Sequence, residues 1–152
     1  MKTNHFLLLF VAACVLASCQ TELQQATGDY SYKTSGEAVS YSATDTLRLT
    51  LPNESGTLDI VSMHTEDSVL LTFNTFGGEV YSTHGLINGK DIIFNPFERT
   101  LHIGLLTYDI TVSGTARRYD ETVVFDLTYS GQSQSLDRTL ESTKVQTIAK
   151  RN

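Results

Sequence analysis

Histidines and carboxylates are the side chains of this chain best suited to metal or acid-base chemistry. His64 opens a His-Thr-Glu-Asp run, but no second histidine follows at helical spacing, which excludes an HExxH zinc site. His84 and His102 stand alone, and His102 is expected to face solvent because apolar residues flank it in an alternating segment. The sequence therefore predicts no metal site, and no motif in it calls for another cofactor.

Motifs for covalent or phosphate chemistry are missing from the sequence as well. The serines include no G-x-S-x-G elbow, and Gly77-Gly78 has neither the lysine nor the following helix of a phosphate loop. Scattered aspartates could do acid-base work only if the fold set two of them close together in a cleft. These aspartates are Asp59, Asp91, Asp109 and Asp126. We predict that the chain is not an enzyme and has no catalytic residue.

Two segments, 108–114 and 125–131, share the pattern aromatic-Asp-aliphatic-Thr-x-Ser-Gly. One interpretation is a repeated ligand-binding motif that uses Asp109 and Asp126. The other is a single hairpin that turns around residues 117–121, with both strands facing the same core. The hairpin is favoured because two strands on one core need the same alternation, and a repeat architecture needs at least three units.

Alternation of apolar and polar residues from Gly28 onward predicts the elements that must position these side chains. Leu47, Leu49 and Leu51 share one face of a segment, which is the period-two signature of a half-buried strand. Turn residues separate the alternating runs at 52–56, 77–78, 88–89 and 95–96, and Asn88-Gly89 predicts a tight hairpin. The pattern predicts an all-β domain, an antiparallel meander of about eight to ten strands in a small barrel or sandwich. Within 132–152 it predicts a final strand, with the last few residues disordered.

Aromatic side chains on the predicted strands offer a better functional lead than the charged ones. Five of them fall on the apolar faces of their strands, where packing in the core is the simplest role. If the strands close into a barrel, its interior can instead hold one small apolar ligand. The candidates for lining such a site are Phe73, Phe94, Tyr108, Phe125 and Tyr129.

Cys19 ends the run Leu16-Ala17-Ser18-Cys19, directly after an apolar segment at 6–15. The apolar segment is too short to cross a bilayer as a helix, which needs about 20 residues, and its length is typical of a signal peptide. The four-residue run resembles the lipobox of bacterial lipoproteins. This resemblance implies that residues 1–18 are a signal peptide and that Cys19 carries the lipid anchor: a diacylglycerol on its sulfur and an acyl chain such as palmitate on its nitrogen.

The predicted mature chain consists of a lipidated cysteine and polar tether at 19–27, then a single β domain at 28–152. Gln20, rather than aspartate, follows the cysteine, so the inner-membrane retention signal of enteric bacteria is missing and the outer membrane is favoured. Cys14 leaves with the signal peptide, so no thiol remains for a disulfide or a metal. The whole chain has 11 Lys and Arg against 17 Asp and Glu, which argues against nucleic acid as a partner.

The lipobox, the polar tether and the strand pattern together resemble the small lipocalin-like lipoproteins of Bacteroidetes. The G-x-W element of lipocalins proper is absent, because the chain has no tryptophan. Two hypotheses follow for a protein attached to the membrane through its lipid. It is a binding module of the bacterial envelope that holds a small apolar ligand inside a barrel. Alternatively, it is a structural or interaction lipoprotein without a ligand cavity, which engages an envelope protein or a glycan through its outer face or loops.

Overall fold

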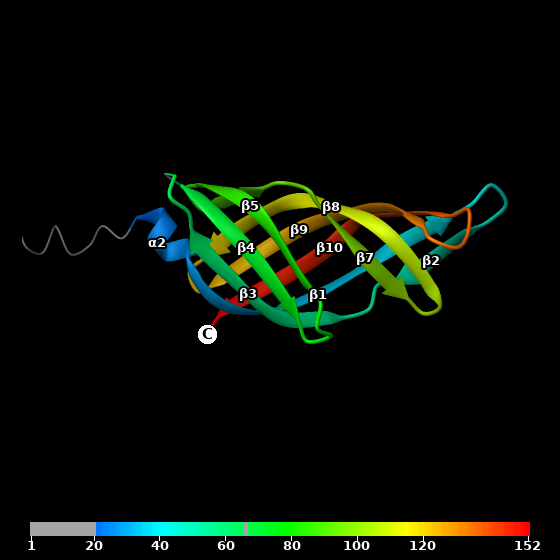
Figure 1. Ribbon diagram of the computed structural model, residues 1–152, viewed down its shortest axis with the longest axis horizontal. Helices are drawn as coiled ribbons and strands as arrows, with labels where there is room; N and C mark the ends of the chain where they lie inside the picture. Colours follow the sequence, from blue (N-terminus) through cyan, green and yellow to red (C-terminus); the bar gives the residue numbers. More distant parts are fainter. Residues whose placement is uncertain (1–20, 66) are drawn as a thin grey trace, which may run out of the picture.

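The computed structural model describes residues 21–65 and 67–152, and of Thr143 the backbone alone. In the described part of the chain ten strands form one antiparallel sheet, which closes into a barrel (Figure 1). The all-β prediction is confirmed, and of the two architectures left open the molecule adopts the barrel. The elements are α2 (Glu22–Ala26), β1 (Gly28–Tyr41), β2 (Thr46–Thr50), β3 (Glu54–Ser62), β4 (Ser68–Thr75), β5 (Val80–Asn88), β6 (Asp91–Phe94), β7 (Phe97–Ile103), β8 (Leu106–Tyr119), β9 (Thr122–Ser133) and β10 (Thr139–Arg151).

The barrel is an up-and-down meander with eight positions around its wall. Each position pairs with the next one along the chain, in the order β1, β3, β4, β5, β6, β8, β9 and β10. β2 continues the line of β3 along β1, and β7 continues the line of β6 along β8. Because all these pairs are antiparallel and, apart from β1 with β10, join segments that follow one another along the chain, short turns suffice to connect the wall.

Both prolines of the chain mark the two places where a long strand is interrupted. Pro52 separates β2 from β3, and Pro96 separates β6 from β7. A proline has no backbone N–H to give to a ladder, so a strand stops or bends there. Since β4 and β5 form a short hairpin between these two lines, the wall is complete on one side of the breaks. On the other side, β2 and β7 run on with no described strand between them.

The barrel closes through the long ladder between β1 and β10. This register runs from the pair Tyr30–Arg151 to the pair Tyr41–Thr139 and contains one bulge, between Glu37 and Val39. On its other edge β1 pairs with β3 and then with β2. Closure gives the two end strands of the meander a partner, so neither is left as an open edge.

Inward positions of the strands are apolar and buried, as the alternation predicts. Leu58, Ile60, Val69 and Leu71 are at most 1% exposed, and the outward neighbours of each are more exposed. Several glycines lie where neighbouring strands come very close: a Cβ on Gly56 would lie 2.0 Å from the carbonyl oxygen of Asn74. Only a residue without a side chain fits such a position.

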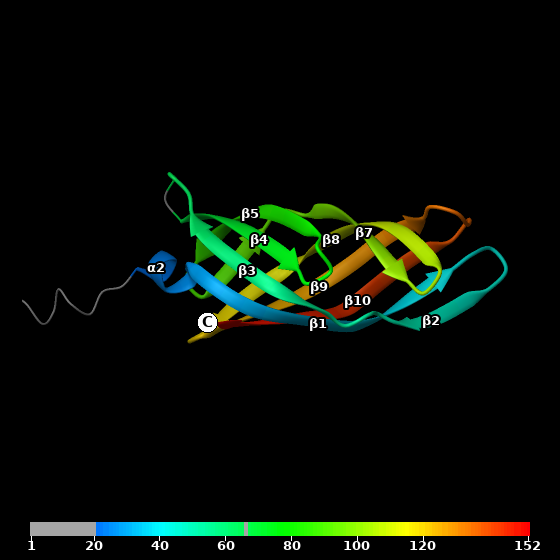
Figure 2. The same ribbon diagram turned by 60° about the horizontal axis from the view of Figure 1, so that its bottom comes forward.

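Helix α2 covers the end of the barrel at which the described chain begins, here called the near end (Figures 1 and 2). The helix lies against β3 and β5, its Ala26 is 1% exposed, and the Tyr30 hydroxyl donates a hydrogen bond to the Ala26 carbonyl at 2.8 Å. A capping box between Thr21 and Gln24 starts the helix. The structure therefore corrects the predicted tether at 19–27, because from Thr21 onward this segment is part of the folded domain. Cys19 and the predicted signal peptide lie outside the described residues.

The predicted turns agree with the structure, and the predicted tail does not. The hairpin at Asn88-Gly89 is confirmed: it joins β5 to β6, and Asn88 pairs with Asp91. The hairpin of the two similar segments is confirmed as β8 and β9, with Tyr119 opposite Thr122. The final strand is confirmed as β10, but the last residues are not disordered. Arg151 stays in the sheet because it pairs with Tyr30 and donates from Nη2 to the Gln25 carbonyl at 2.5 Å.

Candidate functional site

A cluster of charged and phenolic side chains lies where the complete wall of the barrel ends. Glu54 opens β3, Glu79 lies in the turn between β4 and β5, and Arg99 lies in β7. Tyr81 and Tyr32 add their hydroxyl groups from β5 and β1. We call these five residues the mouth cluster. They connect β1 and β3, the β4–β5 hairpin, and β7, which are the parts of the wall that border the gap between β2 and β7.

Arg99 is the centre of the mouth cluster. Its guanidinium binds the Glu54 carboxylate through its two terminal nitrogens, with Nη1 at 3.0 Å from Oε1 and Nη2 at 2.5 Å from Oε2. Nη2 also donates to Glu79 at 3.1 Å, and Nη1 donates to the Tyr81 hydroxyl at 2.9 Å. The guanidinium lies 4.4 Å from the centre of the Tyr81 ring. A bidentate arginine–carboxylate pair stacked on an aromatic ring fixes both position and orientation.

Glu54 accepts hydrogen bonds from three residues. Besides Arg99, the Tyr81 hydroxyl donates to its Oε1 at 2.7 Å and the Tyr32 hydroxyl donates at 3.2 Å. Burial alone would raise the pKa of the Glu54 carboxyl, but its bonds to Arg99, Tyr81 and Tyr32 outweigh burial and lower the pKa. The carboxylate is therefore held in its charged form. The hydrogen bonds from these donors offset the free-energy cost of burying the Glu54 carboxylate.

The tyrosines around the cluster are held in their neutral form. Burial raises the pKa of Tyr81 and of Tyr32 far above the ordinary value, and the Glu54 carboxylate raises both further. Burial also raises the pKa of Tyr129 to about 12, although the positive charge of Arg99 opposes the rise. None of these phenols can serve as a base near neutral pH. The arrangement is therefore suited to holding the wall together rather than to acid-base catalysis.

None of the five residues of the mouth cluster is among the candidates predicted from the sequence, and Arg99 is the one with the clearest signal there. It lies on the same face of β7 as Phe97 and Leu101, and its side chain is 7% exposed. The signal for it was present in the sequence, because the alternation of Phe97-Glu98-Arg99-Thr100-Leu101 puts a charged residue on the apolar face. An arginine at such a position needs a buried partner, and sequence alone does not say which carboxylate supplies it.

The five aromatic candidates are all buried in the barrel interior. Phe125 packs edge-on against Phe73 at 5.5 Å between ring centres and in a tilted arrangement against Phe94 at 6.0 Å. Tyr129 is 4% exposed, and the Tyr108 hydroxyl shares a 2.7 Å hydrogen bond with the Ser40 hydroxyl. Phe73 also contacts rings outside the candidate set, stacking on Tyr81 and Phe97 and meeting Tyr32 edge-on. These rings fill the middle of the barrel with one another, and that they line a ligand stays a prediction.

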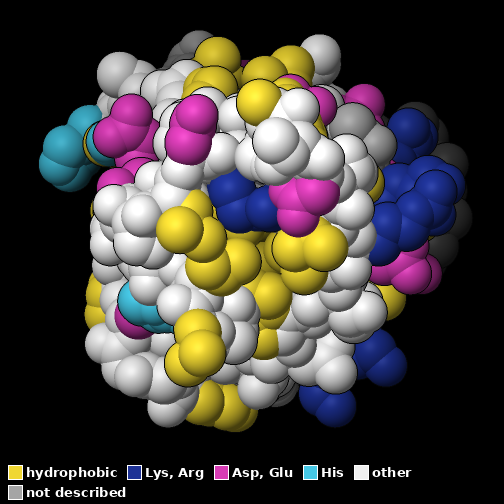
Figure 3. All heavy atoms as spheres, turned by 90° about the vertical axis from the view of Figure 1, so that its right-hand side faces the viewer, with side chains coloured by type: hydrophobic (Ala, Val, Ile, Leu, Met, Phe, Trp, Pro, Cys, Tyr) yellow, Lys and Arg dark blue, Asp and Glu magenta, His cyan; other side chains and the backbone are white. Residues whose placement is uncertain are grey.

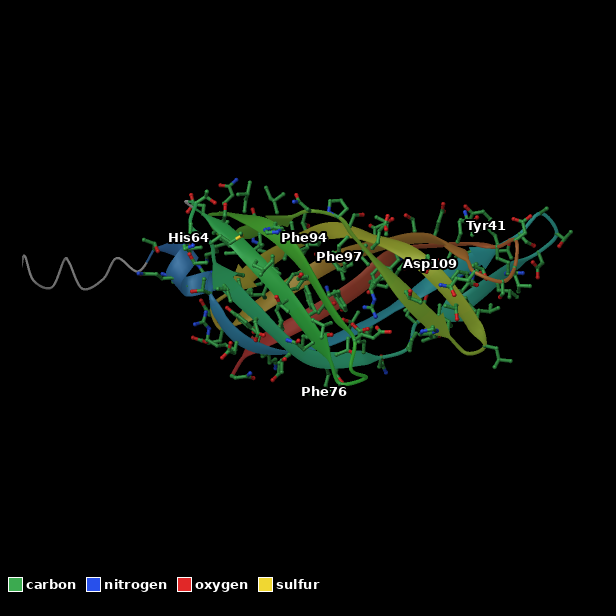
Figure 4. All side chains as sticks on the ribbon, in the orientation of Figure 1. Tyr41, His64, Phe76, Phe94, Phe97 and Asp109 are labelled. Atoms are coloured by element: carbon green, nitrogen blue, oxygen red, sulfur yellow. The ribbon has the colours of Figure 1, made fainter. Side chains whose placement is uncertain are left out.

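The polar candidates from the sequence do not converge on one place. Asp109 pairs with Gln132 and Asp126 pairs with Thr115, so six residues, or roughly 20 Å of strand, separate the two aspartates. His102 is exposed as predicted, and its Nδ1 lies 3.1 Å from the Thr107 hydroxyl. Figure 4 shows His64 at the near end and Asp109 well away from it. Among the residues that the structure describes, no three His, Cys, Asp or Glu side chains could share a metal ion.

Four grooves on the described surface could accept a ligand. The largest, of about 520 Å³, crosses the outer face of β1, β2 and β10 and includes Tyr41 and Arg48. One of about 500 Å³ lies where β6 diverges from β8, and one of about 330 Å³ lies on β7 and β8 beside Asp109. The fourth, of about 340 Å³, lies on the mouth cluster and includes Phe76 and Leu101. None of these four is lined by the five aromatic candidates.

The end of the barrel opposite to α2, here called the far end, is built from three hairpin turns. These turns join β1 to β2, β7 to β8 and β9 to β10, and they lie together at one end in both ribbon views (Figures 1 and 2). Arg138 holds two of them together: Nη1 binds Asp45 at 2.6 Å, and Nε and Nη2 bind the Ser40 hydroxyl and carbonyl. The β7–β8 and β9–β10 turns each expose a leucine, with Leu105 fully exposed and Leu136 at 51%, and Leu47 near the start of β2 is 41% exposed.

Figure 3 looks onto this far end. Hydrophobic side chains gather in the middle of the face, around a basic group, inside a rim of polar atoms. The inward side chains of the strands that run past the mouth cluster are apolar and only partly buried, namely Leu49, Ile103 and Leu106. The far half of the barrel therefore exposes apolar surface above the packed aromatic rings.

Comparisons with known proteins do not identify a function for this chain, so its function has to be inferred from the geometry. No family model, no curated protein and no solved structure matches this chain. Within the described residues, no helix has both the length and the apolar character needed to cross a membrane.

Replacing Arg99 tests whether the mouth cluster stabilises the barrel. Arg99→Met leaves Glu54 buried without its cation, so we expect the free energy of unfolding to fall by about 3 kcal/mol in urea titrations. The double variant Arg99→Met, Glu54→Gln removes the stranded charge, and we expect it to recover a large part of the loss. If both variants lose the same stability, the two side chains are not coupled.

The lowered pKa of Glu54 predicts how stability depends on pH. Because its pKa in the folded protein is below the ordinary value of 4.5, Glu54 stabilises the fold fully above about pH 4.5. This contribution is lost as the pH falls through the lowered pKa. We expect the stability advantage of the wild-type chain over Glu54→Gln to shrink between pH 5 and pH 3 in urea titrations. A difference that stays constant over this range would contradict the assignment.

Proposed function

We propose that this protein is a lipid-anchored binding module of the bacterial envelope, attached through Cys19, that takes up a small apolar ligand in the far half of its barrel. The observation that carries the proposal is the gathering of partly exposed hydrophobic side chains at the far end (Figure 3). A closed β-barrel is a rigid wall that supports such a site without any enzymatic group.

The position of the start of the described chain supports attachment at the near end. Thr21 caps the helix that covers this end, and only Gln20 lies between Thr21 and Cys19. The far end lies at the opposite extreme of the long axis (Figure 2). An anchor at Cys19 therefore leaves the far end free of the anchoring segment.

The two halves of the barrel differ in how their interior is used. Between the near half and the mouth cluster, in the middle of the barrel, the ring of Phe125 contacts the rings of Phe73 and Phe94, so these side chains cover one another. In the far half, Leu49, Ile103 and Leu106 remain partly exposed, and the mouth cluster closes the floor beneath them. Apolar side chains that stay exposed gain by covering themselves with an apolar molecule. We therefore place the ligand above the mouth cluster, not among the five aromatic candidates.

One observation favours the alternative function, interaction with an envelope protein. Leu105 and Leu136 are exposed on two different turns rather than on the inward face of a strand. Exposed leucines on loops at one end of a barrel are typical of a protein-binding surface. The two functions differ in which leucines they require, so substitutions separate them.

The anchor is tested by mass spectrometry of protein purified from bacterial membranes. We expect the N-terminus to be Cys19 carrying a diacylglycerol and an acyl chain, and we expect Cys19→Ala to appear in the soluble fraction with its leader uncut. Recovery of a wild-type chain with a free Cys19 thiol would refute the anchor and leave the barrel's binding function to be judged separately.

The ligand site is tested with the neutral apolar dye N-phenyl-1-naphthylamine. We expect saturable binding to the wild-type protein, measured by dye fluorescence, and a loss of affinity of about tenfold for Ile103→Gln, because a polar amide replaces an apolar wall. The matched control is Ile148→Gln, since Ile148 is an exposed isoleucine on the outer face of β10.

Each result of the dye experiment decides between the two functions. Binding that Ile103→Gln and Ile148→Gln weaken equally is surface adsorption and would refute the interior site. Absence of saturable binding would also refute it and would favour the protein-interaction function, in which Leu105→Glu, and not Ile103→Gln, abolishes capture of a partner.

A further inference from the structure

The wall made by β3, β4, β5 and β6 carries a group of apolar side chains on its outer face, beside the end that α2 covers. Outward side chains of neighbouring strands lie directly opposite one another there: Val61 faces Leu70, and Leu86 faces Ile93. Val61, Leu86 and Ile93 are between 53% and 56% exposed. Met63 joins them, 39% exposed, with its sulfur 3.1 Å from Nδ1 of His84. We call these residues, Val61, Met63, Leu70, His84, Leu86 and Ile93, the side patch.

The same wall carries further exposed apolar residues beyond the side patch. Val80 is 66% exposed on the outer face of β5, and Phe76 is 76% exposed in the turn between β4 and β5. Figure 4 shows Phe76 at the outer tip of this turn. Polar outward side chains separate these two residues from the side patch, since Asp59 lies opposite Thr72 and Thr72 lies opposite Ser82. The side patch is thus a compact apolar area at the near end of this wall, of a kind that a monomer in water rarely leaves uncovered.

The opposite wall, formed by β9, β10 and β1, has a polar outer face. Its outward positions carry Ser31, Lys33, Asp126 and Gln146, all exposed. The exceptions are Val39 at 37% exposure and Ile148 at 42%, with Val124 opposite Ile148. The barrel is therefore amphipathic across its width, with one apolar side and one polar side.

The start of the described chain lies at the near end, close to the side patch. Helix α2 packs against β3 and β5, two of the strands that carry the side patch. The helix also reaches across the barrel end, where Glu22 pairs with Arg118 of β8. Thr21 caps the helix, and the two chain steps from Thr21 to Cys19 span at most about 7 Å, so Cys19 is tied to the near end. A lipid attached to Cys19 therefore brings the near end of the barrel, and with it the side patch, close to the bilayer.

We propose that the wall of β3, β4, β5 and β6 is a membrane-contacting face, on which the barrel lies flat against the lipid surface with the side patch among the headgroups and upper acyl chains. This inference rests on the proposed anchor at Cys19. Six patch residues next to an anchor reproduce the arrangement of monotopic proteins, in which an apolar face is buried about 5–10 Å into the interface. The chain's net charge of −6 favours an uncharged lipid surface over an anionic one.

Membrane contact also orients the proposed ligand site. The gap between β2 and β7 lies directly above the β4–β5 turn, on the wall that carries the side patch. An apolar molecule leaving the bilayer would reach this gap without crossing water. The class of ligand that fits this orientation is a membrane-soluble one.

The test uses the full-length lipidated protein in phosphatidylcholine vesicles. Leu86→Cys and the matched control Ile148→Cys each introduce one exposed cysteine for a polarity-sensitive fluorophore, because lipid occupies Cys19. We expect the fluorophore at position 86 to shift to shorter wavelengths and to be quenched by nitroxide-labelled lipids. We expect the fluorophore at position 148 to show neither change.

The outcomes separate this inference from the anchor itself. Equal quenching at both positions would mean that the barrel enters end-on, and no quenching at either would mean that it stands away from the lipid; both results overturn the proposal. If the protein does not float with the vesicles and the dye labels Cys19, the anchor has failed instead. Stronger quenching at position 86 than at position 148 supports the flat orientation.

Discussion

Pairing of β1 with β10 is the interaction on which the rest of this structure depends. A meander of antiparallel strands buries one face, but its first and last strands remain open edges until they meet. Here β1 is long enough to pair with β10 along almost its whole length and, on its other edge, with β3 and β2 in succession. The inward side chains thereby acquire a single enclosed interior. The position of helix α2 also follows from closure, since it covers an end that exists only once the wall is complete.

The unequal lengths of the strands give the closed wall two different halves. The β4–β5 hairpin ends well before its neighbours do, so β2 and β7 extend past it from breaks at Pro52 and Pro96. The charged residues of the mouth cluster lie beside these breaks. Glu54 follows the first break and Arg99 follows the second, and Glu79 lies in the intervening turn. A paired arginine can bridge such a gap in the wall because its long side chain brings several donors to carboxylates on different strands.

The distribution of exposed apolar residues links the fold to the proposed setting of the protein. Leucines on the far turns and the side patch on the near wall occupy different parts of the surface, and the wall across the barrel from the side patch is polar. A monomeric protein surrounded by water rarely exposes two separate apolar areas. The proposed attachment at the near end would provide an apolar phase for one of them and leave the far end for a ligand or a partner.

The amino-acid sequence by itself determined the all-β class, the meander and most of its turns. It could do so because these follow from local alternation and from residues such as Asn88-Gly89, Gly77-Gly78 and the two prolines, whose preferences do not depend on distant parts of the chain. It also marked the interior aromatic residues as buried, since a period-two face has to be covered. Its error in the last few residues has a simple cause: a chain end is ordered only where something holds it, and Arg151 is held by Tyr30 and Gln25 from the other end of the chain.

Only the tertiary structure decided that the sheet closes into a barrel, which residues meet at its mouth and which outer faces are apolar. Glu54, Glu79, Tyr81 and Arg99 come from four separate elements, and no spacing rule connects them. Likewise, the side patch joins residues whose neighbours are set by cross-strand register rather than by sequence distance. The docking of α2 escaped the sequence as well, because its short polar segment is helical only where the barrel end offers Ala26 and Leu23 a place to pack. The physical reason is the same in each case: alternation specifies which way a side chain points relative to its own strand, whereas closure and register specify what it meets.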